Sequence, residues 1–142
     1  MFSKSCTYGL RAVIYIANVS IDGRRVGLSE IAEAIDSPTA FTAKILQQLT
    51  KSKIVKSIKG PNGGFCIESE NLETPLRDIV MVFEGDKYLE GCGLGLSACD
   101  DDHPCPLHNE FLEVRKKLSA FLENNTLASV INQNVDQILL KR

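Results

Sequence analysis

The sequence contains no tryptophan, and only 6% of its residues are aromatic. It has no apolar run long enough to cross a membrane, and residues 1–11 lack the apolar stretch of a secretory signal peptide. We therefore expect a cytoplasmic protein with no membrane partner, in which clustered cysteines serve metal or redox chemistry more often than disulfides. The sequence shows neither a nucleophile–base pair nor a substrate-binding motif, so we do not expect an enzyme. A length of 142 residues with 44% hydrophobic content fits one globular domain with a small appendage.

Acidic residues are absent from one internal segment. Residues 37–67 hold five lysines and no aspartate or glutamate, although the formal net charge of the chain is −2. Residues 1–67 carry nine basic side chains against four acidic ones, whereas residues 68–142 carry seven against fourteen. Most charge runs are only solvated faces. An acid-free basic segment in an acidic protein nevertheless favours a polyanionic partner such as nucleic acid.

Three amphipathic helices are predicted in the first part of the chain. Apolar residues recur at helical spacing in residues 5–19, in a segment that begins at Leu28, and in a segment that ends near Lys51. The tight turn between the second and third helices is typical of a helix-turn-helix. The caps are expected from Ser3 or Ser5 for the first helix, from Ser29 for the second, and from Ser37, with Pro38 in the first helical position, for the third.

A β-hairpin with a basic tip is predicted next. Residues 54–58 and 65–67 are β-rich runs around Asn62-Gly63, a dipeptide that accepts the positive φ angles of a tight turn. A helix-turn-helix followed by such a hairpin is a winged helix, and we assign residues 1–86 to this DNA-binding domain. The predicted fold class is mainly α with a small β wing. A structural α+β fold without a DNA role is the alternative, and the lysines on the third helix and the hairpin argue against it.

The third helix and the tip of the wing carry the candidate DNA contacts. The N-terminal half of a recognition helix normally reaches base edges, and small residues there allow contact with thymine methyl groups. A wing tip suits the minor groove and adjacent phosphates. The predicted DNA-binding residues are Thr39, Ala40, Thr42, Ala43, Lys44 and Gln48 on the helix, and Lys59, Gly60, Pro61 and Asn62 on the wing tip. On this helix we expect Thr39, Thr42, Lys44 and Gln48 to face outward and Phe41, Ile45, Leu46 and Leu49 to be buried. Phosphate contact and mere solubility remain alternatives for Lys51, Lys53 and Lys56.

Residues 87–105 form a cysteine-rich loop that glycine and proline keep from becoming a helix or strand. The loop holds three of the five cysteines of the chain, and both histidines lie between Cys92 and His108. Thiolates are the preferred ligands of iron–sulfur clusters and zinc, although the spacing is looser than in a zinc ribbon or a ferredoxin. We therefore predict metal or redox chemistry, with structural zinc as an alternative. His103 is expected to be solvated, and Cys6 and Cys66 to be small buried apolar residues.

Residues 106–142 are assigned to a dimerisation helix that begins at Pro106 and a weaker tail helix over 127–140. A shorter helix, with Thr74-Pro75 as its cap, is expected to end at Gly85 before the loop. Five apolar residues of the dimerisation helix recur at alternating four- and three-residue steps, the seam of a coiled coil. Packing of this helix on its own domain is the equally compatible alternative. The predicted seam consists of Leu107, Phe111, Val114, Leu118 and Phe121.

The chain resembles the Rrf-type winged-helix transcription regulators, of the IscR- and NsrR-like kind that bind iron–sulfur clusters. The match covers nearly the whole chain up to about Val130, and the wing combined with three loop cysteines is highly specific. The resemblance rests on TyrGlyLeuArgAlaVal at 8–13, LeuSerGluIleAla at 28–32, LysIleLeuGlnGlnLeu at 44–49, LysGlyProAsnGlyGlyPhe at 59–65 and CysProLeuHis at 105–108.

The resemblance implies a homodimer that binds a double-stranded DNA operator and holds a 2Fe–2S or 4Fe–4S cluster. Its metal ligands would be Cys92, Cys99, Cys105 and His108. Other family members take the fourth ligand from a carboxylate of the partner's first helix. Here Thr7 stands at that position and cannot ligate in the same way, whereas the neighbouring Cys6 could. Lys59 stands where arginine is common, and Phe111 where many relatives have tryptophan.

The expected function is therefore a dimeric repressor whose operator affinity is controlled by a cluster that senses redox state, nitric oxide or cluster status. A metal-free thiol regulator or a zinc-dependent regulator on the same scaffold is the first alternative. An iron–sulfur electron-transfer protein, whose basic wing docks an acidic partner, is the second.

Overall fold

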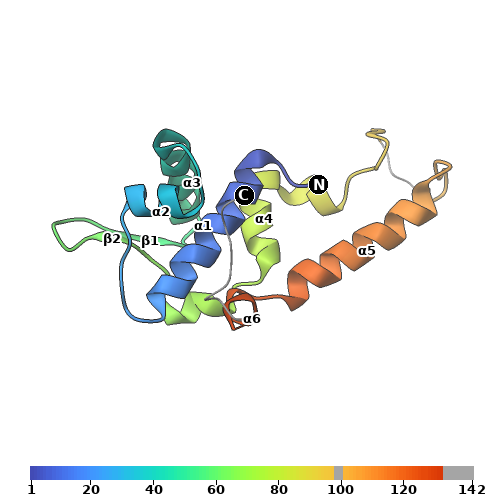
Figure 1. Ribbon diagram of the computed structural model, residues 1–142. Coiled ribbons are helices and arrows are strands. Elements are labelled where there is room, and N and C mark those ends of the chain that lie inside the picture. Colours follow the sequence, from blue (N-terminus) through green and yellow to red (C-terminus); the bar gives the residue numbers. More distant parts are fainter. Residues whose placement is uncertain (98–100, 133–142) are drawn as a thin grey trace.

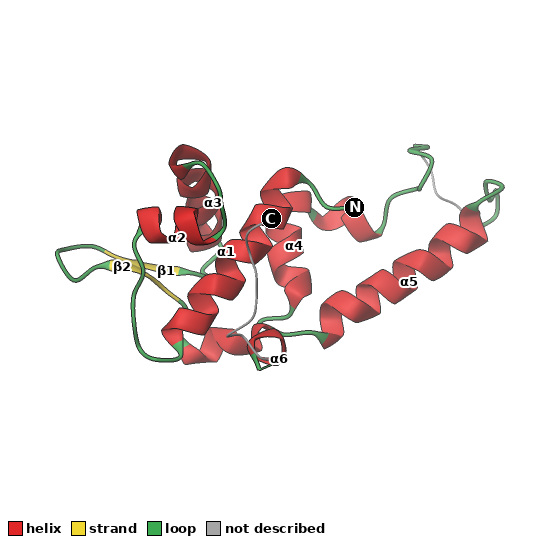
Figure 2. Ribbon diagram, in the orientation of Figure 1, coloured by secondary structure: helices red, strands yellow, loops and turns green. Residues whose placement is uncertain are grey.

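The computed structural model describes residues 1–97 and 101–132 of the chain. Its helices and strands are α1 (Lys4–Ser20), α2 (Leu28–Ala34), α3 (Thr39–Lys51), β1 (Lys56–Ile58), β2 (Gly64–Cys66), α4 (Leu76–Glu84), α5 (His108–Asn124) and α6 (Leu127–Ile131), with 3-10 helices at Ser69–Glu73 and Asp86–Leu89. The hairpin β1–β2 projects at one end of the molecule and α5 projects at the other, with α1 between them (Figure 1). Helices dominate, and the two strands form the only sheet of the described part (Figure 2). The predicted fold class, mainly α with a small β wing, is confirmed.

Helix α1 is the element against which most of the others pack. It contacts α2, α3, α4, α6 and β2, and its residues Val13 and Ile16 are fully buried. Such burial follows from apolar residues that recur every three or four positions and therefore share one side of a helix. Ser3 caps α1, because its Oγ accepts a hydrogen bond from the backbone N–H of Cys6 at 3.2 Å. This confirms the helix predicted over residues 5–19 and selects Ser3 over Ser5 as its cap.

The helix-turn-helix pair α2 and α3 is confirmed, but its caps differ from the prediction. Gly27 is the N-cap of α2, and Ser29 lies inside the helix. Ser37 closes α2 and does not cap α3, because its backbone N–H bonds the carbonyl of Ala32 at 2.9 Å. Pro38 is consequently the N-cap of α3 and not its first helical residue.

The turn of the wing also differs from the predicted Asn-Gly turn. The chain reverses where the N–H of Gly63 donates to the carbonyl of Gly60 at 2.9 Å. Positive φ angles occur at Gly60 (110°) and Gly64 (136°), and not at Asn62. The physical reason is Pro61, whose fixed negative φ suits the second position of a turn in which the next residue needs no positive φ.

A backbone bridge joins the wing to the segment between α1 and α2. The N–H of Val26 donates to the carbonyl of Phe65 at 3.0 Å, and the N–H of Phe65 donates to the carbonyl of Val26 at 2.7 Å. Gly64 permits this close approach, since a Cβ there would lie 2.8 Å from the carbonyl oxygen of Val26. The bridge anchors Arg25, the residue before Val26, beside the wing.

The hydrophobic core extends from the winged helix into the last part of the chain. Ile79 and Val80 of α4, Leu122 of α5, and Leu127 and Ile131 of α6 are buried in the same cluster as α1. Residues 8–67 therefore do not form the core by themselves.

The boundaries of the later helices match the prediction in part. Helix α4 ends at Gly85 (φ 80°) as predicted, although Pro75 is its N-cap without a side-chain bond. Helix α5 begins at His108 and not at Pro106. Helix α6 begins at Leu127 as predicted, and the remainder of the predicted tail helix beyond residue 132 lies outside the described residues. Within residues 1–97 and 101–132, no helix has the length and apolar character needed to span a bilayer.

Candidate functional site

The solvent face of α3 carries most of the predicted DNA-binding residues. Thr39, Ala40, Lys44 and Gln48 are exposed and Ala43 is half-buried. The opposite face packs into the core through three fully or almost fully buried residues, Ile45, Leu46 and Leu49. The split follows from the helical period, because positions 40, 44 and 48 fall on one side of the helix and 45, 46 and 49 on the other. The exposed face presents small, polar and basic groups, which suit contact with a DNA groove.

Thr42 is an exception, and its predicted outward orientation is wrong. Its side chain is completely buried, and its Oγ1 donates to the carbonyl oxygen of Pro38 at 2.9 Å. Thr42 precedes Ile45 and Leu46 by three and four positions, so it belongs to the buried stripe. That spacing was the signal in the sequence. Thr42 is therefore not placed to contact DNA.

The wing tip (residues 59–62) is exposed throughout, as the prediction requires. Lys59 follows β1 directly, so its side chain lies at the base of the turn. One functional candidate that the sequence did not reveal lies beside it. The Nη1 of Arg25 donates to the backbone carbonyl of Asn62 at 3.0 Å, across 37 residues of sequence. A contact over that separation has no local pattern that could have predicted it.

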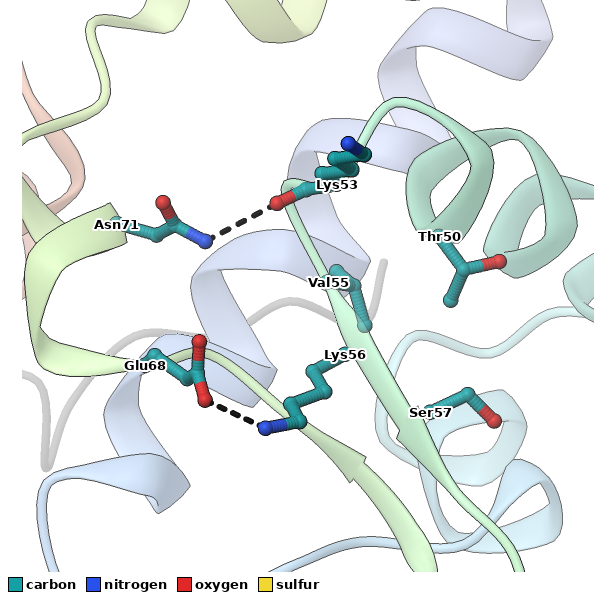
Figure 3. A pocket seen from close by; sticks show the side chains of 7 residues that line it. All are labelled: Thr50, Lys53, Val55, Lys56, Ser57, Glu68 and Asn71. Carbon is teal, nitrogen blue, oxygen red and sulfur yellow. Dashed lines mark hydrogen bonds and ion pairs between the residues drawn. The ribbon is translucent and has the colours of Figure 1, made fainter.

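Lys56 and Lys53 line a shallow polar pocket beside the wing together with Glu68 and Asn71 (Figure 3). The Nζ of Lys56 forms an ion pair with Glu68 at 2.7 Å, and the nearby carboxylate raises the pKa of Lys56. The carbonyl of Lys53 accepts a hydrogen bond from the Nδ2 of Asn71 at 3.0 Å, while its side chain points away from the ion pair. The charge of Lys56 is therefore balanced locally, whereas Lys53 presents its ammonium group to solvent.

The cysteine loop is held at both ends by turns. Cys92 accepts a hydrogen bond from the N–H of Gly95 at 2.9 Å, and Cys105 accepts one from the N–H of His108 at 3.0 Å, both through their backbone carbonyls. The two cysteines are half-buried, and neither forms a disulfide with another described residue. Cys99, the third predicted thiolate ligand, lies outside the described residues.

His108 occupies the first position of α5 and is buried, with 7% of its surface exposed. Its Nε2 lies 2.9 Å from Oδ1 of Asp101. An ionised carboxylate only accepts hydrogen bonds, so this contact places a ring proton on Nε2. Ligating histidines are commonly held by a carboxylate on their second nitrogen in this way. His103, by contrast, is exposed, as predicted.

The loop is also attached to the side of α5. The Nη1 of Arg115 donates to the carbonyls of Glu90 and Gly91 at 3.0 and 2.9 Å. Gly93 lies against the ring of Phe111, since a Cβ there would come within 2.5 Å of three ring atoms. These contacts place the segment around Cys92 along α5 at Phe111 and Arg115. Among the described residues, no three histidine, cysteine or acidic side chains gather closely enough to hold a metal ion.

The predicted seam lies on the exposed side of α5. Leu107, Val114 and Phe121 are 40%, 60% and 53% exposed, and Phe111 and Leu118 are half-buried. Leu107, Phe111 and Val114 line a shallow apolar groove together with Glu110. Contiguous exposed apolar surface of this kind is typical of a protein–protein contact.

Cys6, the alternative fourth ligand, is fully buried in the core. Burial and the nearby carboxylate of Glu84 raise the pKa of its thiol to about 12. A metal ligand must be a thiolate that reaches the metal, so these observations argue against ligation by Cys6. Thr7 donates its hydroxyl to the carbonyl of Ser3 at 3.0 Å. Cys66 on the wing is half-buried, less than predicted.

Comparison with known proteins gives consistent matches across the chain. Residues 2–133 match the model of the family described as "Rrf2: Iron-dependent Transcriptional regulator". A chain from Aquifex aeolicus (strain VF5), provisionally named an HTH-type transcriptional regulator, is 35% identical over 135 residues, which cover 93% of this chain and 92% of that protein. A chain with the same name from Haemophilus influenzae (strain ATCC 51907 / DSM 11121 / KW20 / Rd) is 26% identical over 126 residues, covering 89% of this chain and 83% of that protein.

Solved structures agree with the fold. CymR, titled the global cysteine regulator of B. subtilis, superposes with a TM-score of 0.76 at 23% identity, over 93% of this chain and 96% of that chain. IscR from T. potens superposes with a TM-score of 0.73 at 21% identity, over 97% of this chain and 91% of that chain. At these identities the likeness concerns the fold alone.

Proposed function

Because the chain belongs to the Rrf2 family of iron-dependent transcriptional regulators, we propose that it is a DNA-binding repressor whose operator affinity depends on an iron–sulfur cluster. The attachment of the cysteine loop to α5 carries this proposal. Arg115 binds two carbonyls next to Cys92, and Gly93 packs on Phe111 of the seam. A change in the loop would therefore act on the same helix that offers the apolar seam.

The DNA-binding part of the proposal assigns two roles. The exposed face of α3, with Thr39, Ala40, Ala43, Lys44 and Gln48, would lie in the major groove and contact base edges. The wing tip, with Lys59, Gly60, Pro61 and Asn62, would contact the minor groove and its phosphates. The small side chains at the start of α3 support the first role, since they let the backbone approach the bases. The lysines of residues 37–67 support both, because no acidic residue in that segment opposes a polyanion.

The cluster part of the proposal assigns Cys92, Cys99 and Cys105 as thiolate ligands and His108 as the fourth ligand. The chemistry of this donor set fits a cluster, because thiolate and imidazole both ligate iron. The contact between Asp101 and Nε2 of His108 supports Nδ1 as the ligating atom. A bound cluster, 2Fe–2S or 4Fe–4S, would supply iron that responds to redox state or nitric oxide.

The dimer part of the proposal assigns the seam to contact with a second copy. Leu107, Phe111, Val114, Leu118 and Phe121 would pair across a two-fold axis. The two winged helices would then meet half-sites about 34 Å apart. Arg115 and Phe111 would transmit a change of the loop to this pairing, and thereby alter the spacing of the two winged helices.

A regulator on the same scaffold that responds through its thiols, without a metal, is the second candidate. It is favoured by one observation, namely that Cys92 and Cys105 are only half-buried, so that an oxidant can reach their thiols. The two candidates differ in iron and sulfide content and in nothing that concerns the DNA-binding surface.

The deciding experiment is anaerobic purification with iron and acid-labile sulfide analysis, absorption and Mössbauer spectra. DNA binding would then be measured with and without the cluster. Cys92→Ala and Cys105→Ala should each lose most of the iron and sulfide, while Cys66→Ala, which alters a thiol on the wing, should retain both. Wild-type protein without iron, or full iron in both loop variants, would reject the cluster and leave the thiol-based regulator.

A further inference from the structure

The segment between α1 and α2 carries two adjacent arginines with different surroundings. The Nη1 of Arg24 lies 2.9 Å from Oε1 of Glu30, and the same oxygen accepts a hydrogen bond from the hydroxyl of Tyr15 at 3.0 Å. The Nη1 of Arg25 donates instead to the backbone carbonyl of Asn62 at 3.0 Å. A carboxylate balances a cation, whereas a carbonyl accepts a hydrogen bond without removing the charge. Arg25 therefore brings a full positive charge to the wing tip, and Arg24 does not.

The position of Arg25 is fixed by the backbone on either side of the contact. Val26 exchanges two hydrogen bonds with Phe65, so the main chain at Arg25 is anchored to β2. The Cβ of Arg25 lies 3.4 Å from the place that a Cβ on Gly64 would occupy. An anchored backbone lowers the conformational entropy that the side chain must lose when it binds a ligand. Arg25 is thus already directed along the wing in the absence of any partner.

The charges around the wing tip favour an anionic partner at this place. Lys56, the other basic residue of the hairpin, is paired with Glu68 at 2.7 Å (Figure 3). Among residues 1–97 and 101–132, no carboxylate forms an ion pair with Arg25 or Lys59. Arg25 and Lys59 are therefore two exposed cations at the wing tip whose charge no described carboxylate balances.

We infer that Arg25 is a DNA-contacting residue beside the wing, which adds a guanidinium group to the point charge of Lys59. This inference rests on the proposed function. A guanidinium carries five N–H donors in a plane, and the bond to Asn62 uses one of them. The remaining donors suit the phosphates that border the minor groove and the narrow groove itself, where arginine is favoured by the enhanced negative potential. The bond to Asn62 makes the wing and the preceding segment one DNA-binding unit.

The inference is tested with the full-length protein and a labelled duplex that the wild type selects from a random-sequence pool. Fluorescence anisotropy at several salt concentrations gives the affinity and the slope of its logarithm against the logarithm of salt concentration. Arg25→Gln should weaken binding roughly tenfold and reduce the slope by about one, as expected for the loss of one phosphate contact. Arg24→Gln is the matched control, with the same chemical change one residue away, and should alter neither quantity. The double variant Arg25→Gln with Lys59→Ala should reduce the slope by about two.

The outcomes separate the inference from the proposed function. Wild-type affinity and slope in Arg25→Gln would overturn the inference and leave DNA binding intact. Weaker binding with an unchanged slope would also overturn it, because Arg25 would then only position the wing. An equal loss in Arg24→Gln would overturn the charge argument. A wild-type protein that selects no duplex from the pool would overturn both proposals, and circular dichroism of each variant verifies that the fold is retained.

Discussion

The seam on α5 gives the sharpest prediction, which is that Val114→Asp prevents dimerisation without unfolding the protomer. Val114 is 60% exposed in the protomer, so its replacement should change the free energy of unfolding by no more than about 0.5 kcal/mol. Complete burial of a valine is worth roughly 1.5–3 kcal/mol, of which the still exposed part is about 1–2 kcal/mol. A two-fold dimer contains the residue twice, so loss of the apolar contact alone weakens association roughly 30- to 700-fold. Two carboxylates placed in the interface add a desolvation cost of several kcal/mol each.

Sedimentation velocity over a concentration series would measure the dimerisation constant, and circular dichroism would measure the fold and its thermal stability. Ala120→Asp is the control, because it adds the same charge at an exposed position of α5 that lies outside the seam. Val114 is a better test than Phe111, whose ring also packs against Gly93 in the cysteine loop. A Val114→Asp protein that dimerises as tightly as the wild type would refute the assignment of the interface to this helix.

Three further predictions concern the wing, the core and the turn between α2 and α3. Lys59→Ala should weaken binding to every duplex and lower the salt slope by about one. Thr39→Ala should instead change which base pairs are preferred. Equal losses of affinity on selected and random DNA for both variants would contradict these separate roles. Burial and Glu84 raise the pKa of Cys6 from 9.0 to about 12. The neutral thiol therefore contributes fully to the free energy of unfolding below pH 9. This contribution should fall as pH rises towards 12, by up to about 1.4 kcal/mol per pH unit. Urea unfolding across this range should show a smaller slope in Cys6→Ala than in the wild type, because the pKa values of Tyr15, Tyr88 and Lys56 are also raised and contribute equally in both proteins. The Oγ of Ser37 is buried without a hydrogen bond to any described residue. Ser37→Ala should therefore leave the free energy of unfolding unchanged or raise it by about 1 kcal/mol. A lower melting temperature of the variant would show that the hydroxyl does form a hydrogen bond.

The sequence predicted the helices well because their information is local. Apolar residues at a spacing of three and four fixed α1 and the buried side of α3, and Gly85 marked the end of α4 through its positive φ. Caps were predicted less well, because a serine between two helices can either end the first helix or cap the second. Ser37 illustrates this, since its backbone closes α2 and leaves its side chain unable to cap α3.

The candidate site was predictable only where its residues follow a local period. The exposed face of α3 and the seam of α5 followed from helical spacing. Thr42 was wrongly predicted to face solvent, because its polar hydroxyl was given more weight than its position in the buried stripe. The contacts of Arg25 with Asn62 and of Arg115 with Glu90 join segments distant in sequence. Such contacts depend on how whole elements pack, so no pattern within one segment could indicate them.

Helix α5 connects these parts of the molecule, and its two ends differ in what holds them. Near its C-terminal end, Leu122 is 1% exposed and belongs to the core of the winged helix. Towards its N-terminal end the helix contacts the cysteine loop through Arg115 and Phe111 and offers Val114 to solvent. A helix fixed at one end converts a small change at the other into a rotation about the fixed end, because its backbone hydrogen bonds keep it rigid. A rearrangement of the loop would therefore move the seam relative to the winged helix, and in a dimer it would change the distance between the two α3 helices without any change within the DNA-binding surface itself.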